Sequence, residues 1–312
     1  MPTNAAQLPS EYVPPPWWAH LTGPNGLELH FGSITMHGRP LLLAVLVIAF
    51  LLISAPLVWL SGQAELKKRW ITWLVLGAIV GPMTWLGRVP TAALAAVVAF
   101  LCAREYVRLV QLTGRDQQLL EVCAVAFPFV ALLAPGVLAA LPFLLILVTL
   151  LPLLDADTDR GGERAGYLTF GVIWVAWAPA QLVLVYHDAF LIIFAVAVTD
   201  VSSWVGGKTL GRLPYLRNNF SDVSPNKTIG GLVGGALGAA LILVLTGSFT
   251  IGLFTAVAVG APLGDLIESM FKRQAKVKDA GDWLPGFGGI LDRVDSLLLV
   301  LPLAALLTGV YL

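Results

Sequence analysis

The residues best suited to chemistry lie in one segment, 264–296, of a chain that is otherwise largely apolar. The segment holds six carboxylates and five basic side chains: Asp265, Glu268, Asp279, Asp282, Asp292, Asp295, Lys272, Arg273, Lys276, Lys278 and Arg293. Asp265 and Glu268 are three residues apart, as are Asp292 and Asp295, so each pair would share one face of a helix. Carboxylates bind hard cations, and lysine and arginine bind phosphate. The pattern predicts a site that holds a divalent cation together with phosphate groups.

The alternative for this segment is a solvated loop whose charges only set the membrane topology. Loop charges of that kind do not require paired acids at both adjoining helices. Carboxylates at membrane depth normally face a bundle interior or a watery cavity, which favours the site.

A second polar segment, residues 199–231, has the composition of an anion site. It begins near Asp200, at the end of an apolar run, and its later part places a hydroxyl and a lysine before a glycine-rich run that should start a helix. Such groups, with the free backbone N–H groups of a helix amino end, bind anions. The residues expected to bind substrate here are Asp200, Lys208, Ser224, Lys227 and Thr228. The alternative is an ordinary basic loop followed by a helix cap.

Composition places the chain among membrane proteins. Its 312 residues are 57% hydrophobic and 12% charged, with a mean hydropathy of +0.83, whereas soluble domains carry about 25% charged residues. A formal net charge of zero argues against nucleic acid as a partner. Cys102 and Cys123 lie in or beside apolar runs, where they suit packing rather than a disulfide or a zinc site.

From residue 40 onward, apolar runs recur at close to the membrane-spanning length of about 20 residues. The predicted fold is an all-α, polytopic helix bundle with nine to ten transmembrane segments. The ten predicted segments are 40–61, 70–87, 90–110, 118–134, 136–154, 167–186, 188–206, 229–247, 250–271 and 294–312. Residues 1–38 contain no Lys or Arg and no long apolar run, so we expect a non-cytoplasmic tail without a cleavable signal.

The basic residues predict the orientation. With ten segments, all of the 19 basic residues except Arg39 and Arg88 fall on one side of the membrane. That side should be cytoplasmic by the positive-inside rule. The candidate site then lies at the cytoplasmic face, and both termini lie on the other side.

A set of spaced residues in segment 264–296 resembles the signature of the phosphatidate cytidylyltransferase (CDP-diacylglycerol synthase) family. The matching residues are Ser269, Lys272, Arg273, Lys278, Asp279, Leu284, Pro285, Gly286, Gly288, Gly289, Asp292, Arg293, Val294 and Asp295. Residues 224–228, SPNKT, are similar to a second element of that family. The chain departs from the family pattern at Phe287, where His is usual, and at Gly230, where Glu is usual.

The resemblance implies a reaction in which CTP and phosphatidate give CDP-diacylglycerol and pyrophosphate, a step of phospholipid biosynthesis. It implies Mg²⁺ held by Asp265 and Asp292, with Glu268 and Asp295 supporting it or sharing a second cation. The implied catalytic residues are Asp265, Asp292, Lys272, Arg273, Lys278, Asp279 and Arg293, with Gly288 and Gly289 at the substrate. The family often has an acidic–aromatic pair near Glu105, although pairing of Glu105 with Arg104 or Arg108 would explain that residue equally well.

On the same basis we expect a cytidylyltransferase-like domain over 67–312, preceded by an additional transmembrane segment over 39–66. The implied location is a bacterial inner membrane. The expected partners are CTP, phosphatidate or a similar lipid phosphate and the lipid bilayer, with a homodimer as one option.

Two alternatives to this function stay open, and one further motif needs an interpretation. Phe287 and Gly230 also suit a diverged member that acts on another lipid phosphate or is inactive. An ion-coupled transporter could use intramembrane carboxylates, but transporters tend to show paired repeats and broken helices at the midplane, whereas here the charge gathers at one face. Residues 155–164, DADTDRGGER, alternate acids as a calcium loop does, yet their glycine is out of register and no closing Glu follows, so we expect a solvated loop.

Overall fold

The computed structural model describes residues 29–31, 34–36, 38–60, 64–281 and 288–310. Most of the predicted tail, together with Asp282, the Leu284–Gly286 turn and Phe287, lies outside these ranges.

The described chain is almost entirely helical. After a short antiparallel hairpin of β1 (Leu29–Phe31) and β2 (Ile34–Met36), the helices are α2 (Gly38–Leu60), α3 (Ala64–Trp85), α4 (Arg88–Val110), α5 (Arg115–Leu133), η1 (Pro135–Ala140), α6 (Leu141–Val148), α7 (Leu150–Leu154), α8 (Gly161–Gly171), η2 (Val172–Trp177), α9 (Ala178–Leu184), α10 (Ala189–Thr209), η3 (Leu210–Arg212), α11 (Ile229–Leu245), α12 (Ile251–Gln274), α13 (Leu291–Val294) and α14 (Leu297–Leu307). Each predicted segment overlaps helix, which confirms the helix bundle. The hairpin is the exception to the all-α prediction.

Five stretches of helix in the described residues are long and apolar enough to cross a membrane: Leu43–Leu60, Arg115–Leu133, Gly161–Leu184, Ala189–Arg212 and Ile251–Gln274. Three shorter apolar stretches accompany them: Trp70–Trp85, Leu141–Leu154 and Ile229–Leu245. By length and composition the chain is therefore a multi-pass membrane protein. The count of ten spans remains a prediction.

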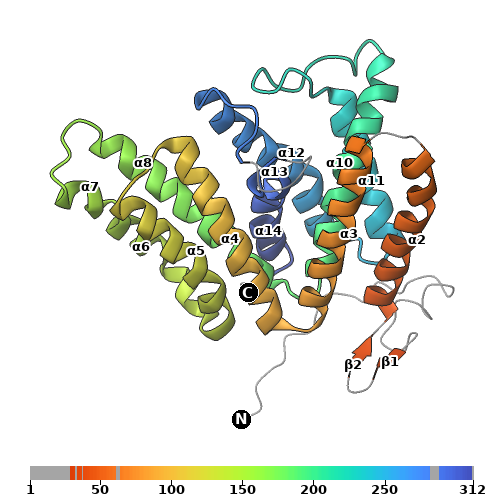
Figure 1. The fold of residues 1–312 in the computed structure, drawn as a ribbon, viewed down its shortest axis with the longest axis horizontal. Helices are drawn as coiled ribbons and strands as arrows, with labels where there is room; N and C mark the ends of the chain where they lie inside the picture. Colours follow the sequence, from red (N-terminus) through yellow and green to blue (C-terminus); the bar gives the residue numbers. More distant parts are fainter. Residues whose placement is uncertain (1–28, 32–33, 37, 61–63, 282–287, 311–312) are drawn as a thin grey trace.

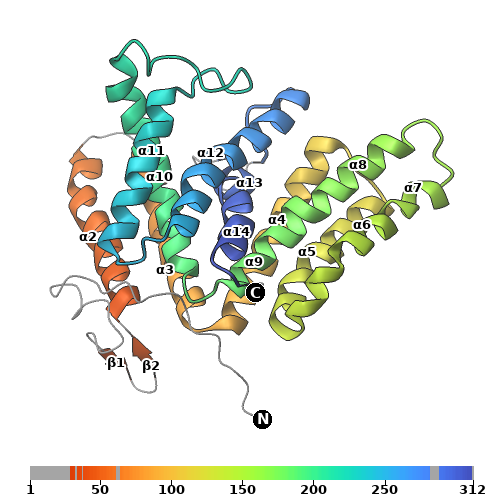
Figure 2. The same ribbon diagram turned by 180° about the vertical axis from the view of Figure 1, so that it is seen from behind.

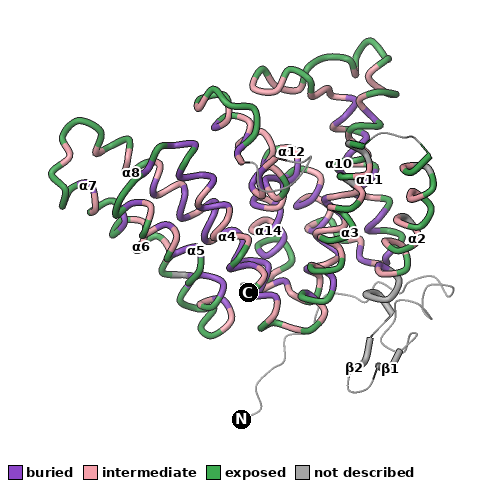
Figure 3. The backbone as a smooth tube through the Cα atoms, viewed as in Figure 1, coloured by how far each residue is buried: buried purple, intermediate pink, exposed green. Residues whose placement is uncertain are grey.

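The helices lie side by side and are joined by connections at the two ends of the bundle (Figure 1). The loop between α10 and α11 lies at one end of the bundle, and the β1–β2 hairpin and the end of α14 lie at the other (Figures 1 and 2). Buried positions concentrate on the central helices, whereas α2 and α3 are largely exposed or half-buried (Figure 3). This is the distribution expected when lipid, rather than water, covers the outer helices.

Helix α4 packs in the most buried part of the bundle because its inner face consists of small residues. Ala92, Ala95, Ala99 and Ala103 recur every three to four residues and are all buried, so neighbouring helices can approach closely. Helix α2 is held mainly by α3, where the Trp70 indole N–H donates to the Ser54 hydroxyl (3.1 Å) and the Trp59 and Trp70 rings meet edge to face at 5.1 Å.

Glycines set the spacing of α10 and α11, which lie next to each other in both views (Figures 1 and 2). A Cβ added to Gly234 would lie 2.6 Å from the Ser202 carbonyl oxygen and 2.7 Å from the Gly206 Cα. A Cβ on Gly206 would lie 2.6 Å from the Gly230 carbonyl oxygen. Close packing of these glycines therefore brings the start of α11 against the polar end of α10.

We expect Gly234→Ala to lower the stability of the solubilised protein by about 1–3 kcal/mol, because its Cβ would strike backbone that has no room to move. Thermal unfolding in detergent measures this. Gly166→Ala is the matched control, since a Cβ there would meet no described atom within 4 Å. An unfolding temperature for Gly234→Ala equal to that of Gly166→Ala would contradict the packing argument.

Candidate active site

Three carboxylates converge where α12 meets the α13–α14 junction. Asp265 and Glu268 come from α12, and Asp295 follows α13; one oxygen of each lies within 4.8 Å of the others. Glu268 is 1% exposed and Asp295 is 8% exposed. The approach depends on Gly264, where a Cβ would lie 2.5 Å from the Asp295 carbonyl oxygen. The Ser269 hydroxyl, one turn further along α12, donates to Asp265 Oδ1 (3.3 Å).

Two lysines meet these acids. Lys272 Nζ pairs with Glu268 Oε2, one turn earlier on α12, and lies 2.7 Å from Asp292 Oδ1. Lys227, from the α10–α11 loop, pairs with Asp265 Oδ2. Glu268 Oε1 is buried and has no hydrogen-bond partner among the described residues. The group therefore contains a buried oxygen whose desolvation is not compensated by any described hydrogen bond.

Asp292 shares Lys272 with Glu268, and in addition its carboxylate accepts two backbone N–H groups. The backbone N–H groups of Ala280 (2.9 Å) and Gly289 (2.8 Å) donate to its Oδ2, while Lys272 pairs with Oδ1. Burial raises the pKa of the Asp292 carboxyl, but hydrogen bonding with Glu268, Lys272 and Gly289 lowers it by more, so its pKa lies below the usual value. The structure thus brings Asp265, Glu268 and Asp295 together, and it places Asp292 beside this group, where it shares Lys272 with Glu268.

The three-carboxylate group suits a hard divalent cation. Mg²⁺ and Ca²⁺ take oxygen ligands, and Mg²⁺ needs only one or two carboxylates in addition to water and substrate phosphate. The unpartnered Glu268 Oε1 and the partly exposed Asp265 provide oxygens for such an ion. The residues present therefore fit the Mg²⁺ expected from the sequence.

The α10–α11 loop holds Lys227 in a narrow turn. The Phe220 N–H donates to the Lys227 carbonyl (2.7 Å), and Asn219 pairs with Thr228 in an isolated bridge. The Thr228 hydroxyl caps α11 by accepting the Gly231 N–H (3.2 Å). These contacts place the amino end of α11 beside the Lys227–Asp265 pair.

The remaining predicted residues lie around this centre or on its polar loops. Asp200, exposed on α10, interacts electrostatically with Asp265, Lys227 and Arg293. Ser224 is half-buried, and its carbonyl accepts the Lys227 N–H (3.0 Å). The exposed predicted residues are Lys208, Arg273, Lys278, Asp279 and Arg293. Gly288 has φ +81°, and a Cβ there would lie 2.9 Å from Asp292 Oδ2.

The departure at Gly230 has a steric explanation. A Cβ at Gly230 would lie 2.7 Å from the Gly211 nitrogen and 3.0 Å from the Leu210 carbonyl carbon. The start of α11 therefore packs directly on η3, and the glutamate that is usual in the family does not fit without moving that backbone.

Glu105 differs from expectation. Instead of an ion pair with Arg104 or Arg108, its two oxygens accept the backbone N–H groups of Ile290 (3.0 Å) and Leu291 (2.7 Å). Arg104 lies 3.7 Å from Glu121 on α5. An acid within an apolar helix is the sequence signal for such a role, and the structure shows that Glu105 is fully buried. Its backbone partners could not be read from the sequence.

The acids of loop 155–164 are also engaged. Arg164 pairs with Asp116 (2.8 Å), Asp155 (2.9 Å) and Asp157 (2.7 Å). Rather than the purely solvated loop that we expected, this segment is tied by Arg164 to the start of α5. A guanidinium already occupies the centre of its carboxylates.

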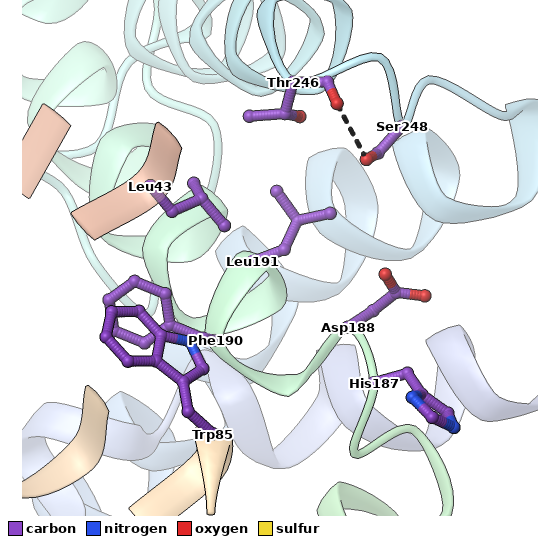
Figure 4. A pocket seen from close by; sticks show the side chains of 8 residues that line it. All are labelled: Leu43, Trp85, His187, Asp188, Phe190, Leu191, Thr246 and Ser248. Atoms are coloured by element: carbon purple, nitrogen blue, oxygen red, sulfur yellow. Dashed lines mark hydrogen bonds between the residues drawn. The ribbon is translucent and has the colours of Figure 1, made fainter. Parts of the chain in front are cut away.

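The two described cavities do not belong to the acidic group. One, of about 30 Å³, is lined by residues that include Leu43, Trp85 and Leu191 (Figure 4), and a second, of about 110 Å³, shares His187 and Asp188 with it. Both lie by the start of α10, whereas Asp200 and Lys208 occupy its other half.

A membrane helix bundle that gathers carboxylates, lysines and a capped helix end at one place has groups suited to binding a cation and phosphate. A model of the cytidylyltransferase family matches residues 67–311, and the chain belongs to this family. This confirms the resemblance drawn from the sequence.

Curated relatives agree with this assignment. Chloroplastic phosphatidate cytidylyltransferase 4 of Arabidopsis thaliana is 33% identical over 286 residues, covering 75% of this chain and 71% of that protein. A phosphatidate cytidylyltransferase of Brucella abortus is 29% identical over 266 residues, covering 80% and 95%. One from Helicobacter pylori is 38% identical over 140 residues, covering 42% and 46%.

We expect Lys272→Met to destabilise the protein by about 3 kcal/mol, because it leaves the buried Glu268 and Asp292 carboxylates without their shared cation. Thermal unfolding at neutral pH, without added divalent cation, measures the loss. Lys276→Met is the control, because Lys276 lies on the same polar stretch but is exposed. Equal unfolding temperatures for the two variants would show that Lys272 does not neutralise these acids.

Proposed function

We propose that this protein is a membrane nucleotidyltransferase that converts CTP and phosphatidate to CDP-diacylglycerol and pyrophosphate. The family match over residues 67–311 and the relatives named phosphatidate cytidylyltransferase support this activity. The observation that carries the proposal is the Asp265–Glu268–Asp295 group, with its unpartnered buried oxygen, next to Lys227 and Lys272.

In this reaction an oxygen of the lipid phosphate attacks the α-phosphorus of CTP. A new P–O bond forms, the bond between the α-phosphorus and its bridging oxygen breaks, and pyrophosphate leaves with the electron pair. The attacking phosphate is already ionised at pH 7, so no strong general base is required. Positioning and charge neutralisation therefore supply most of the catalysis.

The residues of the site divide into two groups. Asp265, Glu268 and Asp295 would hold Mg²⁺, which when bound neutralises charge on the triphosphate and on the attacking oxygen. Lys227 and the Thr228-capped end of α11 would bind phosphate through a point charge and free N–H groups. The exposed Arg273, Lys278 and Arg293 would neutralise the departing pyrophosphate. Asp292 and Lys272 would keep Glu268 in place by their ion pairs.

The topology is part of the proposal. The polar end that holds the acids, the α10–α11 loop and most basic side chains would face the cytoplasm, with both termini on the other side. The chain would cross a bacterial inner membrane about ten times, with a tail over 1–38, an additional span over 39–66 and the catalytic domain over 67–312. The match that begins at residue 67 supports this division. A homodimer remains compatible with it.

A second candidate is a member that acts on a different lipid phosphate. The packing of Gly230 against η3 favours it, because an acidic side chain usual in the family is excluded there. Purified protein assayed with CTP and a series of lipid phosphates distinguishes the two candidates. Turnover restricted to a lipid other than phosphatidate would select the second.

We expect Asp265→Ala and Asp292→Ala to abolish CTP-dependent product, with a loss of at least about 10²-fold and near-normal expression. Glu268→Gln and Asp295→Asn should do the same. Radiolabelled CTP with Mg²⁺ and phosphatidate gives the measurement, and a chelator should stop turnover by the wild type. The control is Asp222→Asn, which changes an exposed acid in the α10–α11 loop. More than about a tenth of the activity in both Asp265→Ala and Asp292→Ala would refute the assignment.

A further inference from the structure

Glu105 lies on α4, outside the segments that carry the other site residues, and it is fully buried. Its Oε1 accepts the N–H of Ile290 (3.0 Å) and its Oε2 accepts the N–H of Leu291 (2.7 Å). A buried carboxylate is costly unless it is hydrogen-bonded. Two backbone donors in the turn before α13 compensate this cost, so the carboxylate and the turn hold each other in position.

The two ends of the loop before α13 also fit closely around this carboxylate. A Cβ added to Gly281 would lie 2.8 Å from Glu105 Cδ, and a Cβ added to Gly289 would lie 2.5 Å from Glu105 Oε2. Only glycine, which has no Cβ, allows positions 281 and 289 to approach the same side chain this closely. The described residues on either side of 282–287 therefore pack closely around Glu105.

The turn that Glu105 holds also places Asp292. Asp292 accepts the N–H groups of Ala280 and Gly289, at the same two ends of the loop, and directs its other oxygen at Lys272. Lys272 in turn pairs with Glu268 of the three-carboxylate group. A continuous chain of contacts therefore connects Glu105 to the predicted cation ligands.

The next residue on α4 fixes the helix itself. The Tyr106 hydroxyl donates to the Tyr167 carbonyl (2.8 Å), and its ring meets Phe271 of α12 at 5.4 Å and Trp174 of η2 at 5.9 Å. Phe271 directly precedes Lys272. Because α4 is anchored to α12 by Tyr106, Glu105 holds the backbone of Ile290 and Leu291 at a fixed position relative to Lys272.

We propose that Glu105 is a positioning residue for the reaction: from α4 it anchors the backbone of residues 290 and 291 and so sets Asp292 against Lys272. Glu105 touches neither substrate nor cation and acts through the turn. This inference rests on the proposed function for its kinetic consequence, whereas its structural consequence can be measured on the ligand-free protein.

The first experiment compares Glu105→Gln with Glu121→Gln. The side-chain amide introduced by Glu105→Gln would set an N–H donor against a backbone N–H donor, which loosens the turn while preserving side-chain size. We expect kcat to fall about 10²-fold with a KM for CTP within about threefold of wild type, because misplacement affects the reacting geometry more than substrate binding. Glu121, half-buried on α5 and paired with Arg104, should tolerate the same change.

Hydrogen exchange on the same ligand-free proteins tests the positioning role of Glu105 separately from the proposed enzymatic function. The amides of residues 288–292 should exchange at least about tenfold faster in Glu105→Gln and unchanged in Glu121→Gln, because only the first loses hydrogen bonds to that backbone. Unchanged exchange would overturn the role of Glu105. Faster exchange in a protein whose wild type does not turn over CTP would instead refute the proposed function alone.

A double substitution tests the contact directly. Gly281→Ala should lower kcat in the wild type, because its Cβ strikes the Glu105 carboxylate. In a Glu105→Ala protein the carboxylate that the new Cβ would strike is absent. Adding Gly281→Ala to it should therefore lower kcat by less than about threefold further, as expected for coupled residues. Losses that simply multiply would show that the loop and Glu105 act independently, and would overturn the proposal even if Glu105→Gln is inactive.

Discussion

The structure depends on the balance of charge where α12 meets the α13–α14 junction. Buried carboxylates are tolerated only when they are paired or hydrogen-bonded. Asp292 meets this requirement with Lys272 and two backbone N–H groups, whereas Glu268 has Lys272 on one oxygen and no described partner on the other. Asp295 lies beside it with Ser296 N–H as its described donor. The described part of the site is therefore short of positive charge, and a cation would complete it.

Close approach of backbones makes this charge distribution geometrically possible. Gly264 lets α12 touch the chain that carries Asp295, and Gly206, Gly230 and Gly234 let α11 lie directly on α10. Apolar helices in a bilayer gain little from hydrophobic burial, so such contacts between small residues determine where helices pack. The same glycines bring the capped end of α11 and Lys227 to the acids. The same close helix contacts therefore determine both how the helices pack and how the site residues come together.

Much of this was accessible from the sequence, because membrane-length apolar runs and paired acids at helix junctions are local patterns. The i, i+3 spacing paired Asp265 with Glu268 and Asp292 with Asp295, and the structure brings Asp265 and Glu268 together with Asp295. Asp292 instead accepts the N–H groups of Ala280 and Gly289 and shares Lys272 with Glu268, so its part in a cation site stays a prediction. The anchoring of the turn by Glu105 is non-local, spanning 186 positions to Leu291. No pattern in a single sequence encodes such a contact.

The departure at Gly230 lies apart from the three converging carboxylates. Gly230 belongs to the start of α11, next to η3, and none of the three converging carboxylates comes from that helix. Glycine at this position therefore leaves the three converging carboxylates in place, and Lys227, three residues earlier, has Asp265 as its described carboxylate partner. A lysine with fewer acidic neighbours is a stronger point charge for an incoming phosphate. Gly230 is thus compatible with nucleotide binding, and its effect should lie in how the phosphates are held.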